Sequence, residues 1–209
     1  MCQAHHLFST SQFENAARDR ALLAKYGIDG PTAEGFLFPD TYNVVRGSSP
    51  QALVEAMLQR FFGQLQTLPG AKALSPQALY DRVILASIVE RETFDREELP
   101  VVAGVFHNRL EHDLKLESCA TVQYLLEVPK PRLDAEDIRI DSPYNTYRHL
   151  GLPPGPIANP GLAALRAALA PQEHDLLYFV SLEDGTHRHH FSRTLAEHQK
   201  AVRQSFGVR

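Results

Sequence analysis

Residues 75–93 constrain the fold most, because they predict a helix that is apolar over nearly all of its surface. Ser75 is a typical N-cap residue, and Pro76 suits the first helical position. At about 100° per residue the apolar side chains fall on two opposite faces: Leu79, Val83 and Ala86 on one, Leu85 and Ile88 on the other. Helices of this kind lie at the centre of a domain, so we expect this one to form the middle of the core.

The last turn of this predicted helix carries two carboxylates, Glu90 and Glu92. Two residues correspond to about 200° of rotation, so the two side chains point to different sides and only one can serve a given site. Desolvation beside apolar surface raises the pKa of a carboxyl group, which is how proteins keep such an acid protonated near neutral pH. The alternative is that both glutamates lie in solvent and pair with Arg91 or Arg96.

The length and charge of the chain favour one compact domain over residues 1–209, with residues 1–33 as a lead-in segment. A formal net charge of -4 leaves no excess of Lys and Arg for phosphates, so nucleic acid is not an expected partner. No apolar run reaches the 18 residues of a membrane span, and the first residues do not resemble a signal peptide.

The remaining pattern is mainly helical with a few short strands, which predicts an α+β fold. A short strand or extended loop is expected over 34–45, a polar insertion over 129–142 and a loop stiffened by prolines over 143–161. The expected helices cover 12–26, 50–66, 101–110, 121–127, 161–169 and 194–204, and a strand is expected at 176–181.

Several kinds of chemistry have little support in the sequence. The chain lacks a Gly-x-Ser-x-Gly motif, a phosphate-binding glycine loop and a His-Glu-x-x-His pair. His187, His189 and His190 suggest a metal, but neighbours in a strand point to opposite faces and no further ligand stands at the right spacing. No motif activates Cys119 as a nucleophile. Carboxylate chemistry remains, beside Tyr, Asn and Thr side chains that suit a sugar ligand.

Several motifs occur in a characteristic order: EGFLFPDTY at 34–42, LASIVERET at 85–93, VAGVFHNRL at 102–110, ATVQY at 120–124 and YNTYRHLGLPPGPIANPG at 144–161. LYFV at 177–180 and HFSRTLAEH at 190–198 follow. In order and spacing they resemble the YceG-like endolytic murein transglycosylase family, and the resemblance covers roughly residues 34–203.

The resemblance implies a mainly helical, lysozyme-like catalytic domain that needs no cofactor and no metal. It assigns the role of catalytic acid to Glu92, the second glutamate of the Glu-x-Glu-Thr motif, and leaves Glu90 as a supporting residue. The other expected supporting or substrate-binding residues are Glu34, Gln123, Tyr144, Asn145, Thr146 and Tyr147.

The implied reaction is cleavage of the β-1,4 bond between N-acetylmuramic acid and N-acetylglucosamine in peptidoglycan glycan strands, leaving 1,6-anhydro ends. Glu92 would act first as general acid and then as base. A hydrolase would ordinarily need a second carboxylate, for which Glu34 is the candidate. The alternative from another class is a peptidoglycan-binding module that holds the glycan without cleaving it.

The chain departs from the family pattern in two places. Residues 117–121 read Glu-Ser-Cys-Ala-Thr where many members have Gln-Ser-Asp-Pro-Thr. The usual N-terminal membrane helix and LysM-like domain are absent from this sequence, so we expect a truncated domain or a late gene start. The full-length protein is expected at the periplasmic side of the cytoplasmic membrane, anchored to it only by the missing helix, with cell-wall synthesis machinery as a further partner.

Overall fold

The computed structural model describes residues 7–207, which form a mainly helical α+β fold. The α-helices are α1 (Thr10–Ala17), α2 (Arg20–Lys25), α3 (Pro50–Leu65), α4 (Pro76–Glu92), α5 (Leu99–Glu111), α6 (Cys119–Gln123), α7 (Leu162–Leu169) and α8 (Leu195–Phe206). Short 3₁₀ helices lie at Ala71–Ala73 and Asp137–Arg139, and two strands, β1 (Tyr178–Ser181) and β2 (His189–Ser192), form one antiparallel pair. The predicted fold class is confirmed.

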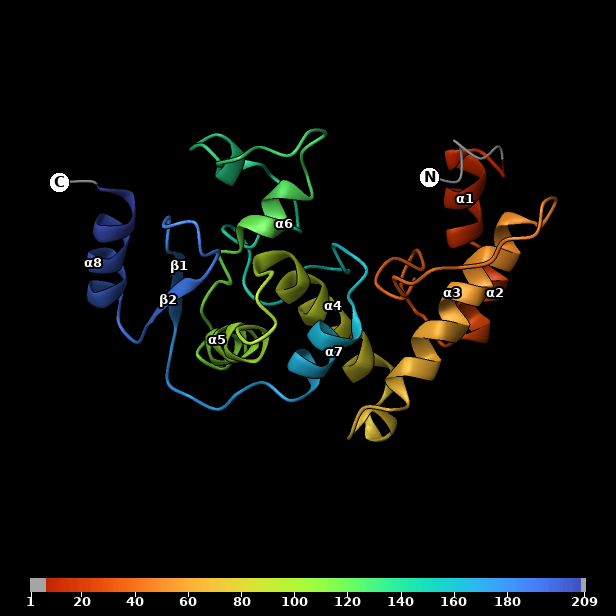
Figure 1. Cartoon of the computed structure of the whole chain (residues 1–209), viewed down its shortest axis with the longest axis horizontal. Coiled ribbons are helices and arrows are strands. Elements are labelled where there is room, and N and C mark those ends of the chain that lie inside the picture. Colours follow the sequence, from red (N-terminus) through yellow and green to blue (C-terminus); the bar gives the residue numbers. More distant parts are fainter. Residues whose placement is uncertain (1–6, 208–209) are drawn as a thin grey trace.

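Helix α4 lies in the middle of the molecule, with α5, α6 and α7 packed around it (Figure 1). The hydroxyl of Ser75 accepts the backbone N–H of Ala78, and Pro76 occupies the first turn, as the sequence predicts. Every residue from Val83 to Val89 is buried. Because neither face of this segment meets water, the helix needs no amphipathic pattern, which agrees with the apolar character read from the sequence.

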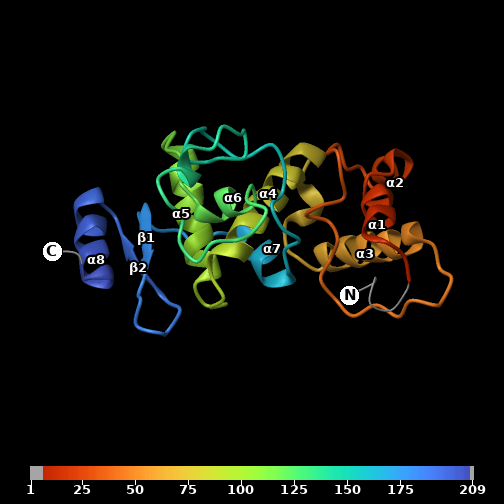
Figure 2. The same cartoon turned by 90° about the horizontal axis from the view of Figure 1, so that it is seen from above.

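The chain before α4 forms a separate group of helices at one end of the elongated molecule (Figures 1 and 2). The single helix predicted over 12–26 is wrong, because α1 and α2 are two helices joined at Arg18 and Asp19. A carboxylate oxygen of Asp19 accepts the backbone N–H groups of Ala21 and Leu22. Asp19 is therefore an N-cap that starts a new helix. The described part of the lead-in segment packs through α1 against α3.

The segment after Ala33 contains no strand and is an extended loop, the second of the two predicted alternatives. Phe36 is buried, and the side-chain oxygen of Asn159 accepts the N–H groups of Gly35 and Leu37. Gly35 has a φ of +88°, and a Cβ there would lie 2.4 Å from Pro156. This glycine permits the close approach between the segment and the proline-rich loop.

The strand pair and α8 form the other end of the molecule (Figure 2). Phe179 pairs with Phe191, and Ser181 pairs with His189. The ring of Phe179 also meets Phe106 of α5 edge-on, with 5.7 Å between centroids. This contact places β2, and with it His189, beside the end of α4 that carries Glu92.

Candidate active site

Glu92 is the last residue of α4 and accepts two hydrogen bonds from the segment that begins α6. The hydroxyl of Ser118 donates to Oε1 of Glu92, and the backbone N–H of Ala120 also donates to the carboxylate. Thr93 is already extended, with φ -140° and ψ 142°. The helix thus ends directly after Glu92. The two hydrogen bonds hold the side chain of Glu92 against the start of α6.

The surroundings of Glu92 favour its neutral form. Burial raises the pKa of its carboxyl group above the ordinary glutamate value and is the largest influence. The hydrogen bonds from Ser118 and Ala120 lower the pKa by a smaller amount, followed by the charges of His189 and Arg91. The predicted effect of the apolar helix on this carboxyl group is therefore confirmed in direction.

Glu92 lines a cavity of about 490 Å³ between the α6 segment, the strand pair and α8. Glu117 is the other carboxylate on its wall and is ion-paired with Arg109. The side chain of Arg109 also donates to the carbonyl oxygens of Lys115 and Leu177, so this pair braces the wall. Among the described residues of the cavity, Glu92 is the carboxylate that has no Arg or Lys partner within ion-pair distance.

Glu90 points to a different side of α4, as the spacing predicts. Its Oε2 atom accepts the backbone N–H of Gly161 at 3.1 Å. Gly161 is the N-cap residue of α7, where a carboxylate is favourable beside unpaired N–H groups. The structure therefore places Glu90 as a link between α4 and α7, outside the Glu92 cavity.

The four residues from Tyr144 to Tyr147 have different surroundings: two are buried in the fold and two line cavities. Asn145 is completely buried, and its amide nitrogen donates to the carbonyl oxygens of Ile138 and Ile140. Thr146 is 1% exposed, and its hydroxyl accepts the backbone N–H of Ser118. Asn145 and Thr146 therefore hold the segment and the Ser118 backbone in place, with no surface left for a ligand.

Tyr147 lines the Glu92 cavity, and its hydroxyl lies 3.0 Å from the sulfur of Cys119. Burial raises the pKa of the Tyr147 hydroxyl, which stays protonated and can donate a hydrogen bond. Burial is also the main cause that raises the pKa of the Cys119 thiol, so the thiolate is disfavoured.

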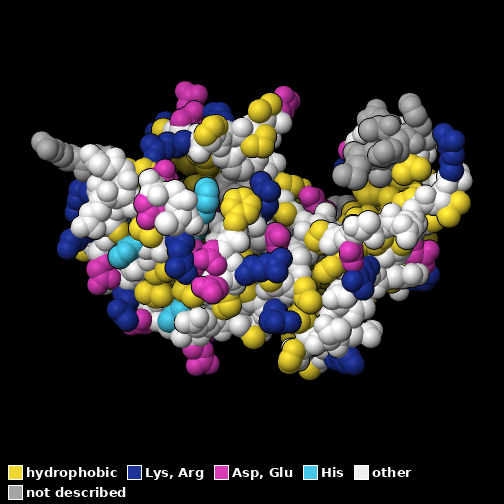
Figure 3. All heavy atoms as spheres, in the orientation of Figure 1, with side chains coloured by type: hydrophobic (Ala, Val, Ile, Leu, Met, Phe, Trp, Pro, Cys, Tyr) yellow, Lys and Arg dark blue, Asp and Glu magenta, His cyan; other side chains and the backbone are white. Residues whose placement is uncertain are grey.

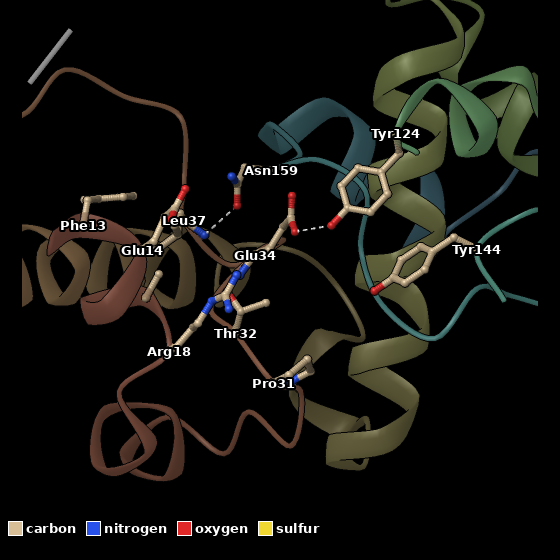
Figure 4. A pocket seen from close by; sticks show the side chains of 11 residues that line it. Phe13, Glu14, Arg18, Pro31, Thr32, Glu34, Leu37, Tyr124, Tyr144 and Asn159 are labelled. Carbon is tan, nitrogen blue, oxygen red and sulfur yellow. Dashed lines mark hydrogen bonds between the residues drawn. The ribbon is translucent and has the colours of Figure 1, made fainter. Parts of the chain in front are cut away.

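Glu34 and Tyr144 lie in a second cavity, of about 480 Å³ (Figure 4). The hydroxyl of Tyr124 donates to Oε2 of Glu34 at 2.7 Å, and the rings of Tyr124 and Tyr144 are 5.1 Å apart. Glu14 of α1 and Arg18, which follows that helix, also line this cavity. In Figure 3 the molecule is hollowed between the part that carries α6 and the part that carries α1. Glu34 thus lines a cavity different from that of Glu92.

Gln123 ends α6 and binds the start of the polar insertion. Its amide donates to the carbonyl oxygen of Lys130 and accepts the backbone N–H of the same residue. The Lys130 ammonium contacts the buried carboxylate of Asp137 at 2.7 Å. Gln123 therefore orders residues 129–142 beside the cavities.

The sequence does not predict the roles of two residues in the site. Ser118 donates directly to Glu92. The sequence suggests a metal at His187, His189 and His190, whereas the structure places the imidazole of His189 on the carboxylate of Glu98. Among residues 7–207, no group of three or more His, Cys, Asp or Glu side chains is placed to hold a metal ion. The position of His189 depends on the strand register, which pairs it with Ser181 and which the sequence does not predict.

Known proteins are similar to this chain in sequence. An endolytic murein transglycosylase of Bacillus subtilis is 36% identical over 169 residues, covering 80% of this chain and 46% of that protein. One from Streptococcus pneumoniae is 33% identical over 153 residues, covering 71% of this chain and 28% of that protein. The chain therefore spans less than half the length of these relatives.

The fold also has a counterpart of known structure. A crystal structure of a yceG-like protein from Listeria monocytogenes superimposes with a TM-score of 0.81 at 30% identity, covering 92% of this chain and 67% of that one. The model of the YceG-like family matches residues 2–204, nearly the whole chain. This protein belongs to the YceG-like family.

Proposed function

We propose that this domain is a lytic transglycosylase that cleaves the β-1,4 bond between N-acetylmuramic acid and N-acetylglucosamine in peptidoglycan strands. The partly buried carboxyl group of Glu92, held by Ser118 on the wall of a cavity, is the observation that carries the proposal. Two relatives that match most of this chain bear the name endolytic murein transglycosylase.

In the first half of the reaction Glu92 is a general acid. Burial favours its neutral form, so it holds a proton at the pH where a free glutamate would have lost it. Glu92 gives this proton to the glycosidic oxygen as the bond to C1 of the muramoyl residue breaks. The leaving sugar departs as an alcohol, and positive charge develops on the muramoyl ring.

In the second half the Glu92 carboxylate is a base. It takes the proton from the muramoyl O6 hydroxyl while that oxygen attacks C1, which closes the 1,6-anhydro ring. The hydrogen bonds from Ser118 and the N–H of Ala120 support the negative charge during this interval. One carboxyl group thus performs both proton transfers, and it ends the cycle protonated.

The described part of the chain places no second available carboxylate in the Glu92 cavity, which favours ring closure over hydrolysis. Glycosidases that use water ordinarily place a second carboxylate about 5–5.5 Å or 6.5–9.5 Å from the acid. Among the described residues of the Glu92 cavity the other candidate is Glu117, which is engaged by Arg109. Glu34, the candidate from the sequence, lines the other cavity.

We assign the remaining predicted site residues to two groups. Tyr147 contacts the glycan beside Glu92, and Glu34 with Tyr144 binds a more distant part of the strand. Glu90, Gln123, Asn145 and Thr146 support these positions through the contacts described above.

We propose that the protein acts at the outer face of the cytoplasmic membrane, where peptidoglycan lies, beside the cell-wall synthesis machinery. None of the helices formed by residues 7–207 combines the length and apolar character that a membrane span requires. Lys and Arg side chains are interspersed with Asp and Glu on the face shown in Figure 3, and we propose no nucleic-acid partner.

Product analysis in water enriched in ¹⁸O tests this function. Purified glycan strands treated with the domain should yield 1,6-anhydro ends by mass spectrometry, without incorporation of ¹⁸O. Incorporation at the new reducing ends would instead indicate a hydrolase. Binding of the strands with no new ends, under conditions where the protein remains folded, would identify a peptidoglycan-binding module.

A further inference from the structure

A buried carboxylate and imidazole lie next to the candidate acid, and neither has a role in the mechanism above. Nδ1 of His189 is 2.7 Å from Oε2 of Glu98, and the backbone N–H of His189 donates to Oε1 at 2.9 Å. The two side chains are only 10% and 8% exposed. An isolated charge at such a depth is costly, so a pair of this kind persists where each partner compensates the other.

The contacts of Glu98 tie this pair to the end of α4. The hydroxyl of Thr93, the residue after Glu92, donates to Oε2 of Glu98 at 3.3 Å. Glu98 is also the N-cap residue of α5. The side chain therefore joins the end of α4, the start of α5 and strand β2, and it keeps His189 beside Glu92.

The Glu98 carboxylate accepts the hydroxyl of Thr93 and the backbone N–H of His189, and Nδ1 of the His189 ring lies at hydrogen-bond distance from its Oε2. Both oxygens of Glu98 are therefore engaged, and a carboxylate at hydrogen-bond distance from Nδ1 compensates positive charge on the ring. His189 lines the same cavity as Glu92, and its charge acts on the Glu92 carboxyl group.

We propose that His189, oriented by Glu98, is a positioning residue that supplies positive charge to Glu92 and stabilises the carboxylate formed after the first proton transfer. This inference rests on the proposed function. It adds a partner that acts through Glu92, in a site where one carboxyl group must be both a good acid and a stable anion.

Two other positively charged side chains near Glu92 are less suited to stabilise its carboxylate. The guanidinium of Arg109 is occupied by Glu117 and by the carbonyl oxygens of Lys115 and Leu177, and Arg91 is exposed, so water screens its charge. The titratable or charged side chains that face Glu92 or His189 are Arg91 on α4, Glu98 and Arg109 on α5, Glu117 before α6, Cys119 on α6, Tyr147, Tyr178 on β1 and His198 on α8.

The test uses His189→Gln and Glu98→Gln in the full chain, with His190→Gln as a matched control. His190 is the next residue of β2, is exposed and borders a different pocket. The Glu92 carboxyl group is titrated by ¹³C NMR, which does not require activity, and the pH dependence of strand cleavage is measured beside it. Circular dichroism and thermal midpoints establish that each variant is folded.

We expect the pKa of Glu92 to rise in His189→Gln, which removes the imidazole, and in Glu98→Gln, which removes the carboxylate that compensates the charge of the imidazole. The pKa of Glu92 should stay unchanged in His190→Gln. The double variant should shift it no further than either single one. An unchanged Glu92 titration in a folded His189→Gln or Glu98→Gln variant would overturn the inference. If the shifts occur while the wild type forms no anhydro ends, the charge coupling stands and the proposed function fails.

Discussion

The hydroxyl of Ser118 donates to the carboxylate of Glu92 across the junction between the end of α4 and the start of α6. The two residues are 26 positions apart in the chain. The backbone N–H of Ser118 donates to the hydroxyl oxygen of Thr146 at 3.0 Å. Thr146 therefore helps to fix the position of Ser118. A partly buried acid with a fixed hydrogen-bond donor is suited to carry negative charge during a reaction cycle, because the donor favours the ionised form.

Replacing Ser118 with Ala should raise the pKa of Glu92 further, because the hydrogen bond favours the ionised carboxylate. The alkaline limit of cleavage should move to higher pH while the maximal rate falls about tenfold or more. Rates of strand cleavage measured across pH, with thermal midpoints as control, check this. A pH profile that coincides with that of the wild type would show that the hydroxyl does not influence the acid.

Glu92→Gln should reduce strand cleavage by a factor of about 10² to 10⁴ or more, because the amide keeps the shape of the side chain but transfers no proton. The protein should lose little stability, since a neutral amide replaces a carboxyl group that burial already disfavours as an anion. The amount of anhydro ends formed per unit time provides the measurement.

Glu90→Gln is the matched control, because Glu90 lies two residues away and its contact is the N–H of Gly161. The glutamine oxygen can still accept that N–H, so cleavage should continue at a similar rate. Loss of activity in Glu90→Gln with retention in Glu92→Gln would reverse the assignment of the two glutamates.

Cleavage should decline on the alkaline side with an apparent pKa above the roughly 4.3 of a free glutamate, since the cycle begins with protonated Glu92. The linked stability has a definite sign. Because the pKa is raised in the folded state, the contribution of Glu92 is complete below the unfolded value and is lost as pH rises through the folded one. Glu92→Gln should remove that part of the pH dependence in chemical unfolding. An apparent pKa at or below the free value would contradict the role of burial.

Much of the fold follows from local sequence signals. Ser75 and Pro76 start α4 where the pattern predicts, and the rotation between Glu90 and Glu92 follows from helix geometry alone. Asp19 was read as part of one helix, although its side chain caps a second. Its capping role depends on a break in the backbone that apolar periodicity over 12–26 does not reveal.

The site was less predictable, because its decisive contacts join distant parts of the chain. Glu98 and His189 are 91 residues apart, and no local pattern indicates that they meet. The family resemblance indicates the segment at 144–147 as a whole and does not distinguish the positions of its members. The side-chain amide of Asn145 is bonded to the backbone, whereas Tyr147 lines the Glu92 cavity.

These different positions predict different outcomes for Asn145→Ala and Tyr147→Phe. Asn145→Ala leaves the carbonyl oxygens of Ile138 and Ile140, both partly buried residues, without their donor, so the free energy of unfolding should fall by about 1–3 kcal/mol. Tyr147→Phe should slow cleavage at least tenfold, about 1.4 kcal/mol of barrier, with a nearly unchanged thermal midpoint. Urea unfolding and cleavage rates on the two variants separate the roles. Normal cleavage by a folded Tyr147→Phe variant would limit Tyr147 to a packing role.

The Glu34 cavity predicts an effect of substrate length. Tyr124 is 39% exposed, its hydroxyl is held by Glu34, and its ring stands beside Tyr144, so the pair offers aromatic surface next to a carboxylate acceptor. A part of the strand bound there is remote from Glu92, so it contributes to binding and not to proton transfer.

Tyr124→Ala should therefore raise KM for long glycan strands several-fold, change kcat little, and leave the cleavage of short fragments that fill only the Glu92 cavity unaffected. Cleavage rates over a series of strands of defined length measure this, with Glu127→Ala, an exposed residue three positions along the chain, as control. An equal loss on short and long substrates would mean that Tyr124 acts by supporting α6, since its backbone N–H bonds the carbonyl oxygen of Ala120 beside Glu92. An unchanged KM for every length would remove the Glu34 cavity from the substrate path, and the strand would then have to leave the Glu92 cavity past α8 and the polar insertion.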